Sequence, residues 1–333
     1  DVGEGFSIAL IRFLKFERVA GDVRMMDTPG GKFMNAERAV GRFVSDGDEV
    51  FVGGFGNLYP FALVHEMIRQ RRRNLTLCKH SPELIGDQLI GAGSVKKLVF
   101  SWLGNPGVGS SHCLRRAVEK GIPQPIELEE YTHAASTGML RAGAMGLPFL
   151  PTKAILGSDI PKHNPRIKFM DCPFTGEKLC LVPALNPDVA LIHAQRADTE
   201  GNVQVWGVTS DIQDGALASE KIVVSVEEVV EAEVTRRDPN RTLIPGFRVD
   251  AVVHEPWGAH PSSAQGYYDR DNDYFVRYER WTRSLEGFET FLDEWVYGVK
   301  SRREYVHRLG TETILELRPK PYPCFEVDYG YYE

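Results

Sequence analysis

Short, continuous apolar runs recur along the chain from about residue 35 onward, separated by stretches in which apolar residues have a helical spacing. Continuous runs are typical of strands that are buried on both faces of a parallel sheet, whereas a strand with one exposed face alternates between apolar and polar residues. The pattern therefore predicts buried strands, which lie at residues 50–53, 75–78, 98–100, 154–156, 179–182, 189–193, 203–206, 222–226 and 251–253.

Helical stretches lie between several of these runs. The clearest is residues 60–70, because Pro60 suits a first helical turn and the residues after it form one apolar stripe: Phe61, Val64, Met67 and Ile68. A second helix is predicted at residues 137–145. Two amphipathic stretches, 274–297 and 301–309, are interpreted as a helical cap. Strand, helix and strand in succession imply right-handed crossovers, so the predicted fold class is α/β: a three-layer α/β/α open, mostly parallel sheet with a C-terminal helical cap.

The pattern also suggests how the chain is divided. Neither an internal repeat nor a low-complexity linker is visible, so we predict a single domain over residues 31–320. Residues 8–14 form an apolar patch without the small-residue cleavage site of a secretory signal. We therefore expect residues 1–30 to be an N-terminal extension outside the fold and residues 321–333 to be a tail.

The amino-acid composition argues against several classes of function. The chain has 333 residues, 26% of them charged, and a formal net charge of −7. This mild acidity argues against a nucleic-acid partner, which would need a basic surface. No stretch of 18 apolar residues is present, so no membrane partner is expected. The five cysteines are scattered without a CxxC pair, which argues against a metal site and indicates a reducing compartment, so we expect a cytoplasmic protein.

The loops after the predicted strands carry the candidate binding residues. In open parallel sheets, ligands bind at the carboxyl ends of the strands, so these loops are expected to converge. The candidates follow four different strands: Gly53, Gly54, Phe55 and Gly56, then His80 and Ser81, then Ser101, and finally Gly157 and Ser158. The glycine loop leads into a predicted helix, an arrangement that brings backbone N–H groups close to an anion or a carbonyl oxygen. A tight turn alone would also explain these glycines, and Tyr59 breaks the dinucleotide fingerprint GxGxxG.

An acidic cluster, Glu127, Glu129 and Glu130, precedes the predicted helix at 137–145. Carboxylates at this place can simply complement the helix dipole. Alternatively, one of them acts as a general base whose pKa is raised by partial burial. Residues 198–202 have the chemistry of a turn, with Gly201 at the position that needs a positive φ.

A series of short blocks, in a fixed order between about residues 35 and 317, points to a known family. The blocks are 52–56 (VGGFG), 146–151 (GLPFLP), 157–158 (GS), 193–203 (HAQRADTEGNV), 236–239 (RRDP), 244–246 (IPG), 249–253 (VDAVV), 256–262 (PWGAHPS) and 268–272 (YDRDN). Together they resemble the alpha subunit of class I CoA-transferases of the glutaconate CoA-transferase type. The resemblance implies an open α/β/α fold, in agreement with the strand pattern.

The resemblance also implies a division of labour between two chains. In such enzymes, the alpha chain pairs with a similarly folded beta chain, in a heterodimer, an α2β2 assembly or a larger one. The beta chain supplies the glutamate that forms an acyl anhydride and then an enzyme–CoA thioester. The present chain shows no comparable nucleophile motif. It is therefore expected to be inactive alone, to move CoA between small carboxylic acids with its partner, and to bind coenzyme A as a co-substrate without a permanent cofactor. The glycine loop and the other strand-end candidates would line the substrate and CoA site.

A related branch leaves two alternatives open. The chain also resembles the alpha subunit of a steroid ring-opening hydrolase, which cleaves a cyclic β-ketoacyl-CoA by a retro-Claisen route with a glutamate base. That base falls at Glu130 here, whereas the glutamate of the glutaconate-type pattern falls at Glu129. Residues 79–83 (KHSPE) depart from the glutaconate type, which leaves the acyl substrate open. A third alternative is a non-catalytic ligand-binding protein of the same fold.

Overall fold

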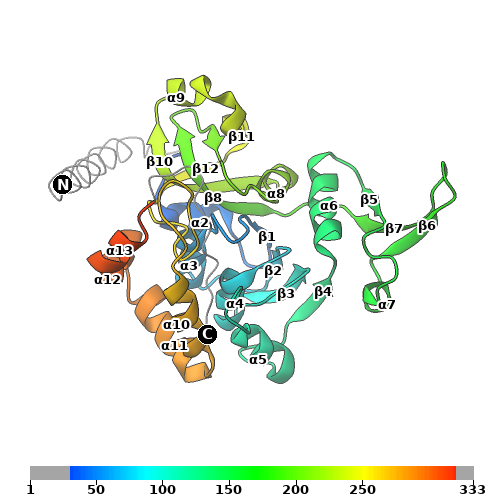
Figure 1. Cartoon of the computed structure of the whole chain (residues 1–333), viewed down its shortest axis with the longest axis horizontal. Coiled ribbons are helices and arrows are strands. Elements are labelled where there is room, and N and C mark those ends of the chain that lie inside the picture. The colour runs from blue at the N-terminus through cyan, green and yellow to red at the C-terminus, as the bar shows by residue number, and fades with distance from the viewer. Residues whose placement is uncertain (1–30, 320–333) are drawn as a thin grey trace.

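The computed structural model describes residues 31–319, which form a central sheet flanked by helices (Figure 1). The predicted N-terminal extension and tail fall outside the described residues. Seven strands of the sheet run parallel to their neighbours: β1 (Glu49–Val52), β2 (Leu75–Cys78), β3 (Val95–Phe100), β4 (Glu127–Glu130), β8 (Val189–Asp198), β10 (Lys221–Val230) and β12 (Ala251–His254). Two short strands pair antiparallel beside β8, namely β9 (Val203–Gln204) and β11 (Thr242–Ile244).

Both faces of the central sheet are buried, which confirms the predicted three-layer α/β arrangement. In β1, Val50 and Val52 belong to one hydrophobic cluster and Phe51 belongs to another, since successive side chains of a strand point to opposite faces. The first face is covered by α2 (Ala36–Phe43), α3 (Phe61–Arg69), α4 (Glu83–Gly91) and α5 (His112–Lys120). The second face is covered by α6 (His133–Ala144) and α8 (Ile212–Ala218). The remaining helical segments on the way to β12 are short: α9 (Ala232–Arg237) and the 3-10 helices Pro239–Arg241 and Gly246–Arg248.

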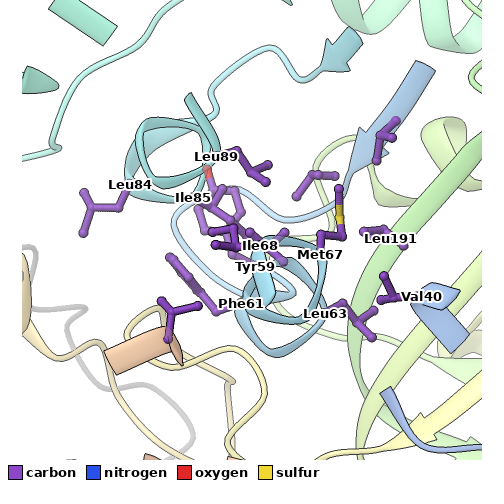
Figure 2. Close-up of a cluster of buried hydrophobic side chains, with 14 of the residues drawn as sticks. Val40, Tyr59, Phe61, Leu63, Met67, Ile68, Leu84, Ile85, Leu89 and Leu191 are labelled. Carbon is purple, nitrogen blue, oxygen red and sulfur yellow. The ribbon is translucent and has the colours of Figure 1, made fainter. Parts of the chain in front are cut away.

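Helix α3 is buried on nearly all sides rather than along one stripe. Every residue from Phe61 to Ile68 is buried, including His65 and Glu66. The helix is covered on two sides, because its side chains lie between α4 on one side and α2 and β8 on the other (Figure 2). The labelled side chains of this cluster include Val40, Phe61, Leu63, Met67, Ile68, Leu84, Ile85, Leu89 and Leu191. The imidazole of His65 is satisfied inside this layer by Gln88, at 2.9 Å.

A second, three-stranded antiparallel sheet stands apart from the central one, beyond α6 (Figure 1). It consists of β5 (Phe149–Thr152), β6 (Lys168–Asp171) and β7 (Lys178–Pro183), with α7 (Ile160–His163) between β5 and β6. The predicted strand at 154–156 is wrong, since these residues lie in the turn after β5, and the strand predicted at 179–182 belongs to this small sheet. The run 203–206 gives only two strand residues, paired antiparallel.

The C-terminal segment forms helices, as predicted, but with different bounds. The stretch 274–297 divides into α10 (Asn272–Thr282), α11 (Leu285–Leu292) and a π-helical turn (Asp293–Tyr297). The break has a local cause, because Ser284 caps α11 by accepting a hydrogen bond from the amide of Gly287. The helices α12 (Arg302–Leu309) and α13 (Thr311–Glu316) follow. Within residues 31–319, no helix has the length and apolar character needed to cross a membrane.

Candidate active site

The carboxyl ends of β1, β2 and β3 place three of the predicted loops side by side, because neighbouring parallel strands end at the same edge of a sheet. The amides of Ser101 and Trp102, after β3, both donate to the carbonyl of His80, after β2, at 3.0 Å. The ring of Phe55, after β1, lies 5.4 Å from the imidazole of His80. Loops that are far apart in the sequence therefore form one continuous surface.

The glycine loop after β1 is a tight turn that needs glycine. Gly54 has a φ of +97°, and a Cβ atom there would lie 2.5 Å from the carbonyl oxygen of Asn57. The amides of Gly53 and Phe55 donate to the carbonyls of Leu191 and Asn57, respectively. Since both amides are used inside the chain, the loop offers fewer free backbone donors than the sequence led us to expect. Its main contribution to the surface is the ring of Phe55, which is 40% exposed.

A buried ion pair lies beneath this loop. The ammonium of Lys79 is 2.9 Å from both carboxylate oxygens of Asp211, and both side chains are fully buried. Lys79 also donates to the carbonyl of Gly54, so the pair connects the glycine loop with the loop after β2. Burial by itself would raise the pKa of Asp211, but Lys79 and the imidazole of His80 hold that pKa below its usual value. Asp211 is therefore a carboxylate whose charge is compensated inside the protein.

His80 is oriented by the same carboxylate. Its Nδ1 atom lies 2.5 Å from Oδ2 of Asp211, so the ring is held against this carboxylate, although the alignment of the two atoms departs from ideal hydrogen-bond geometry. Burial lowers the pKa of His80, and the charge of Lys79 lowers it further, while Asp211 opposes this change. The lowered pKa favours the neutral imidazole at neutral pH, and the carboxylate beside Nδ1 favours the tautomer that carries its hydrogen on that atom.

A second imidazole completes the polar surface. His133, the first residue of α6, lies with its ring centroid 5.3 Å from that of His80. Its Nε2 atom forms a hydrogen bond with the hydroxyl of Ser81 at 2.8 Å. Burial and the charge of Lys79 both lower the pKa of His133. Two neutral imidazoles and one hydroxyl therefore face each other, an arrangement that can donate hydrogen bonds and accept protons.

Further groups support this surface from below. The hydroxyl of Ser101 forms a hydrogen bond with that of Ser136 on α6, at 2.8 Å. The hydroxyl of Tyr59 donates to the carbonyl of Ser81 at 2.7 Å. Glu83, at the start of α4, is 5% exposed, and burial raises its pKa to about 7. The site thus has a buried, hydrogen-bonded base under a polar and aromatic rim.

Three of these residues were not among the candidates drawn from the sequence. Lys79 belongs to a predicted loop but was not itself a candidate, and His133 and Asp211 were not candidates either. The only local signal is position: Lys79 directly follows a buried strand, while His133 begins α6 and Asp211 immediately precedes α8. Asp211 and Lys79 are 132 residues apart, so only the fold could bring them together.

The two predicted glutamates lie on β4, which the sequence pattern did not identify as a strand. Glu129 is buried and its carboxylate is satisfied by Lys97 at 2.6 Å and the hydroxyl of Tyr131 at 2.6 Å. Burial opposes ionisation, but these two hydrogen bonds hold the pKa of Glu129 below its usual value, which does not suit a general base. Glu130, by contrast, is exposed at the carboxyl end of the strand.

The last two predicted loop residues lie elsewhere. Gly157 and Ser158 follow β5 in the small antiparallel sheet, so they are not at the carboxyl edge of the central sheet. Both are exposed, and the hydroxyl of Ser158 donates to the carbonyl of Ile155 within its own turn. We expected all four loops to converge, and this was wrong for the loop at 157–158. The strand predicted before this loop, at 154–156, is a turn. Among the described residues, no cluster of His, Cys, Asp and Glu side chains could hold a metal ion.

Comparison with known proteins gives consistent matches over most of the chain. A family model described as Coenzyme A transferase matches residues 33–255. The chain is 47% identical to the A-type subunit of 3-oxoadipate CoA-transferase from Pseudomonas knackmussii, over 82% of this chain and 96% of that protein. It is 35% identical to the A-type subunit of glutaconate CoA-transferase from Acidaminococcus fermentans, over 89% of this chain and 98% of that protein. The crystal structure of the latter enzyme matches with a TM-score of 0.80, covering 86% of this chain and 96% of the compared one. A more distant relative, the cholesterol ring-cleaving hydrolase IpdA subunit of Rhodococcus jostii, is 31% identical over 80% of this chain and 92% of that protein.

Proposed function

The chain belongs to the coenzyme A transferase family, and from this premise we propose that it acts with a B-type subunit to move CoA between small dicarboxylic acids. The observation that carries the proposal is the match to the A-type subunits of two CoA-transferases over nearly their whole length. Both of these relatives are named after dicarboxylic acids, which suggests the same class of acyl group here.

The candidate active site supports the need for a second subunit. The carboxylates that belong to it, Asp211 and Glu83, are both buried, and Asp211 is already paired with Lys79. Neither is placed to attack a thioester. A nucleophilic glutamate supplied by the partner would meet this chain at the rim formed by Phe55, His133 and Trp102, all of which are exposed.

The reaction then proceeds in exchanges that conserve the thioester. The partner's carboxylate attacks the acyl carbon of the acyl-CoA, which gives an acyl–glutamyl anhydride and the CoA thiolate. The thiolate attacks the glutamyl carbonyl, which releases the free acid and leaves a glutamyl–CoA thioester. An incoming acid reverses both steps. Covalent catalysis of this kind divides one difficult transfer into easier exchanges. This chain would orient the acyl group with its imidazoles and Ser81, and its aromatic rim would exclude water, which otherwise hydrolyses the intermediates.

Co-expression with a B-type subunit from the same organism tests the proposal. We expect thioester exchange between succinyl-CoA and a second dicarboxylic acid in the complex, and none with the isolated chain. Mass spectrometry of the complex incubated with acyl-CoA should find a glutamyl–CoA adduct on the B-type chain. Full activity of the isolated chain, or exchange without any adduct, would contradict the proposal.

A second candidate, a ring-opening acyl-CoA hydrolase, is favoured by one observation: Glu130 is exposed at the carboxyl end of β4, so its carboxylate is available as a base. If Glu130 is the base, Glu130→Ala should lower the rate of ring opening by about 10²-fold or more. Under the transferase proposal, the same variant should keep exchange activity within a few-fold of the wild type. Glu127→Ala is the matched control, because it removes another exposed glutamate from the same strand, one that pairs with Lys97.

A further inference from the structure

The imidazole of His80 is prepared for one particular ligand. We propose that His80 recognises the carboxylate of the acyl substrate that does not react, and that it takes up one proton as this carboxylate binds. The inference rests on the proposed function, because it concerns how the same site selects its dicarboxylic substrates. It assigns to this chain both the discrimination between dicarboxylic and monocarboxylic acids and a dependence of that discrimination on pH.

The geometry leaves one atom of His80 available. Its Nδ1 atom faces Asp211, so Nε2 is the ring atom that remains for a ligand. The Nε2 atom of His133 is bonded to Ser81, whereas the one polar neighbour found for the His80 ring among the described residues is Asp211, on the Nδ1 side. The side chain of His80 is 4% exposed and lies under the rings of Phe55 and His133, which both border solvent. The free nitrogen of His80 therefore belongs to the layer of the site directly behind these two rings.

Charge balance determines what this ligand can be. Lys79 and Asp211 compensate each other, and a neutral His80 leaves these three side chains without net charge, while the nearby carboxyl of Glu83, whose pKa is raised to about 7, can add only negative charge. A carboxylate that bound here without a proton would add an uncompensated negative charge to a dry environment, which is costly. Protonation of Nε2 restores neutrality and turns the contact into a charge-assisted hydrogen bond.

The surrounding groups make this proton uptake conditional on binding. Lys79 at the end of β2 and His133 on α6 disfavour a second proton on His80, while Asp211 before α8 favours it. Burial lowers the pKa of His80 in the free site, so the proton is absent at neutral pH. An incoming carboxylate adds a second negative neighbour next to Nε2, which raises the pKa again. The proton therefore arrives with the ligand.

Two acids with the same number of carbon atoms, glutarate and pentanoate, separate this effect from others. Both have a carboxylate for the reacting end of the site, and only glutarate has one for His80. Calorimetric titration of the complex with the B-type subunit, in phosphate and in Tris buffer at pH 7.5, gives the number of protons bound with each acid. We expect glutarate to bring close to one proton more than pentanoate. The affinity for glutarate relative to pentanoate should fall about tenfold per pH unit above neutrality.

Variants connect the proton to His80. In His80→Gln, we expect the extra proton to disappear and the affinity for glutarate to fall by about 10-fold to 100-fold, as for the loss of a charged hydrogen bond. Binding of pentanoate should fall much less than binding of glutarate, because pentanoate has no second carboxylate for His80. His307→Gln, which changes an exposed histidine on α12, is the matched control and should retain the extra proton. If glutarate and pentanoate bring equal numbers of protons in the wild type, or if His80→Gln keeps the preference for glutarate, the inference is wrong. The comparison of glutarate with pentanoate in the wild type needs no variant. It therefore tests the inference even if His80→Gln fails to fold.

The outcome is distinguishable from a failure of the proposed function. A complex that forms no glutamyl–CoA adduct with acyl-CoA would contradict the transferase proposal itself. A complex that forms the adduct but shows no extra proton with glutarate would contradict only the role of His80.

Discussion

Replacement of Glu83 by glutamine should stabilise the protein at alkaline pH. Glu83 opens α4 with a φ of +43° and is 5% exposed beneath the candidate active site. Burial raises its pKa from 4.5 to about 7, although the polar groups of Tyr59 and Gly56 and the charges of Arg270 and Lys79 oppose the change. At about 1.4 kcal/mol per pKa unit, this displacement corresponds to about 3 kcal/mol.

The sign of the effect follows from proton linkage. Because the pKa of Glu83 is higher in the folded chain than in the unfolded chain, its protonated form favours folding, fully so below pH 4.5. That contribution is lost as the pH rises through 7. Glutamine has nearly the same size and never ionises. We therefore expect Glu83→Gln to exceed the wild type by less than about 1 kcal/mol at pH 5 and by up to about 3 kcal/mol at pH 8.5.

Urea unfolding followed by tryptophan fluorescence at pH 5, 7 and 8.5 measures this difference. The exposed Glu289 on α11 provides a matched control, since Glu289→Gln removes the same charge from the surface. A stability difference between Glu83→Gln and the wild type that stays constant over the three pH values would refute the reasoning, because the effect would then come from packing and not from ionisation.

Two further changes test the structure around the same site. Asp211→Ala leaves the ammonium of Lys79 buried and unpaired, so it should destabilise the chain by about 3–5 kcal/mol. The double variant with Lys79→Met should recover part of this loss in urea unfolding, whereas simple addition of the two single effects would argue against a direct pair. Gly54→Ala introduces a Cβ atom against the carbonyl of Asn57 at a positive φ. It should displace the glycine loop and lower exchange activity of the complex by about 10²-fold, with an unchanged circular dichroism spectrum; retained activity would show that the loop tolerates a side chain there.

Some features of the fold could be predicted because their cause is local. The runs at β1, β2 and β10 are apolar on both faces, and this burial requires helices above and below the sheet. The turn at 198–202 likewise follows from its own residues, since Gly201 has a φ of +86° and Asp198 accepts the amides of Glu200 and Asn202. Such elements depend on short-range sterics and hydrogen bonds, which the sequence displays directly.

Other features escaped prediction because their stabilising partners are distant. Three of the four residues of β4 are exposed, so the strand has no apolar pattern, and only its hydrogen bonds to β3 define it. The run 179–182 is as apolar as a central strand, but it pairs antiparallel with β5 and β6. The hydrophobic pattern of a segment indicates that the segment is buried. It does not indicate which strand the segment pairs with, because that depends on residues far away in the sequence.

The candidate active site also has features that could be predicted from the sequence and features that could not. The sequence by itself determined that glycine, histidine and serine loops follow the strands of a parallel sheet, and it carried the family resemblance that the comparisons confirmed. Only the tertiary structure decided which of these loops meet, and it added Asp211, which neutralises Lys79 and orients His80. The physical reason is that a buried charge needs a compensating charge within a few ångströms in space, and the chain is free to supply that charge from any distance in sequence.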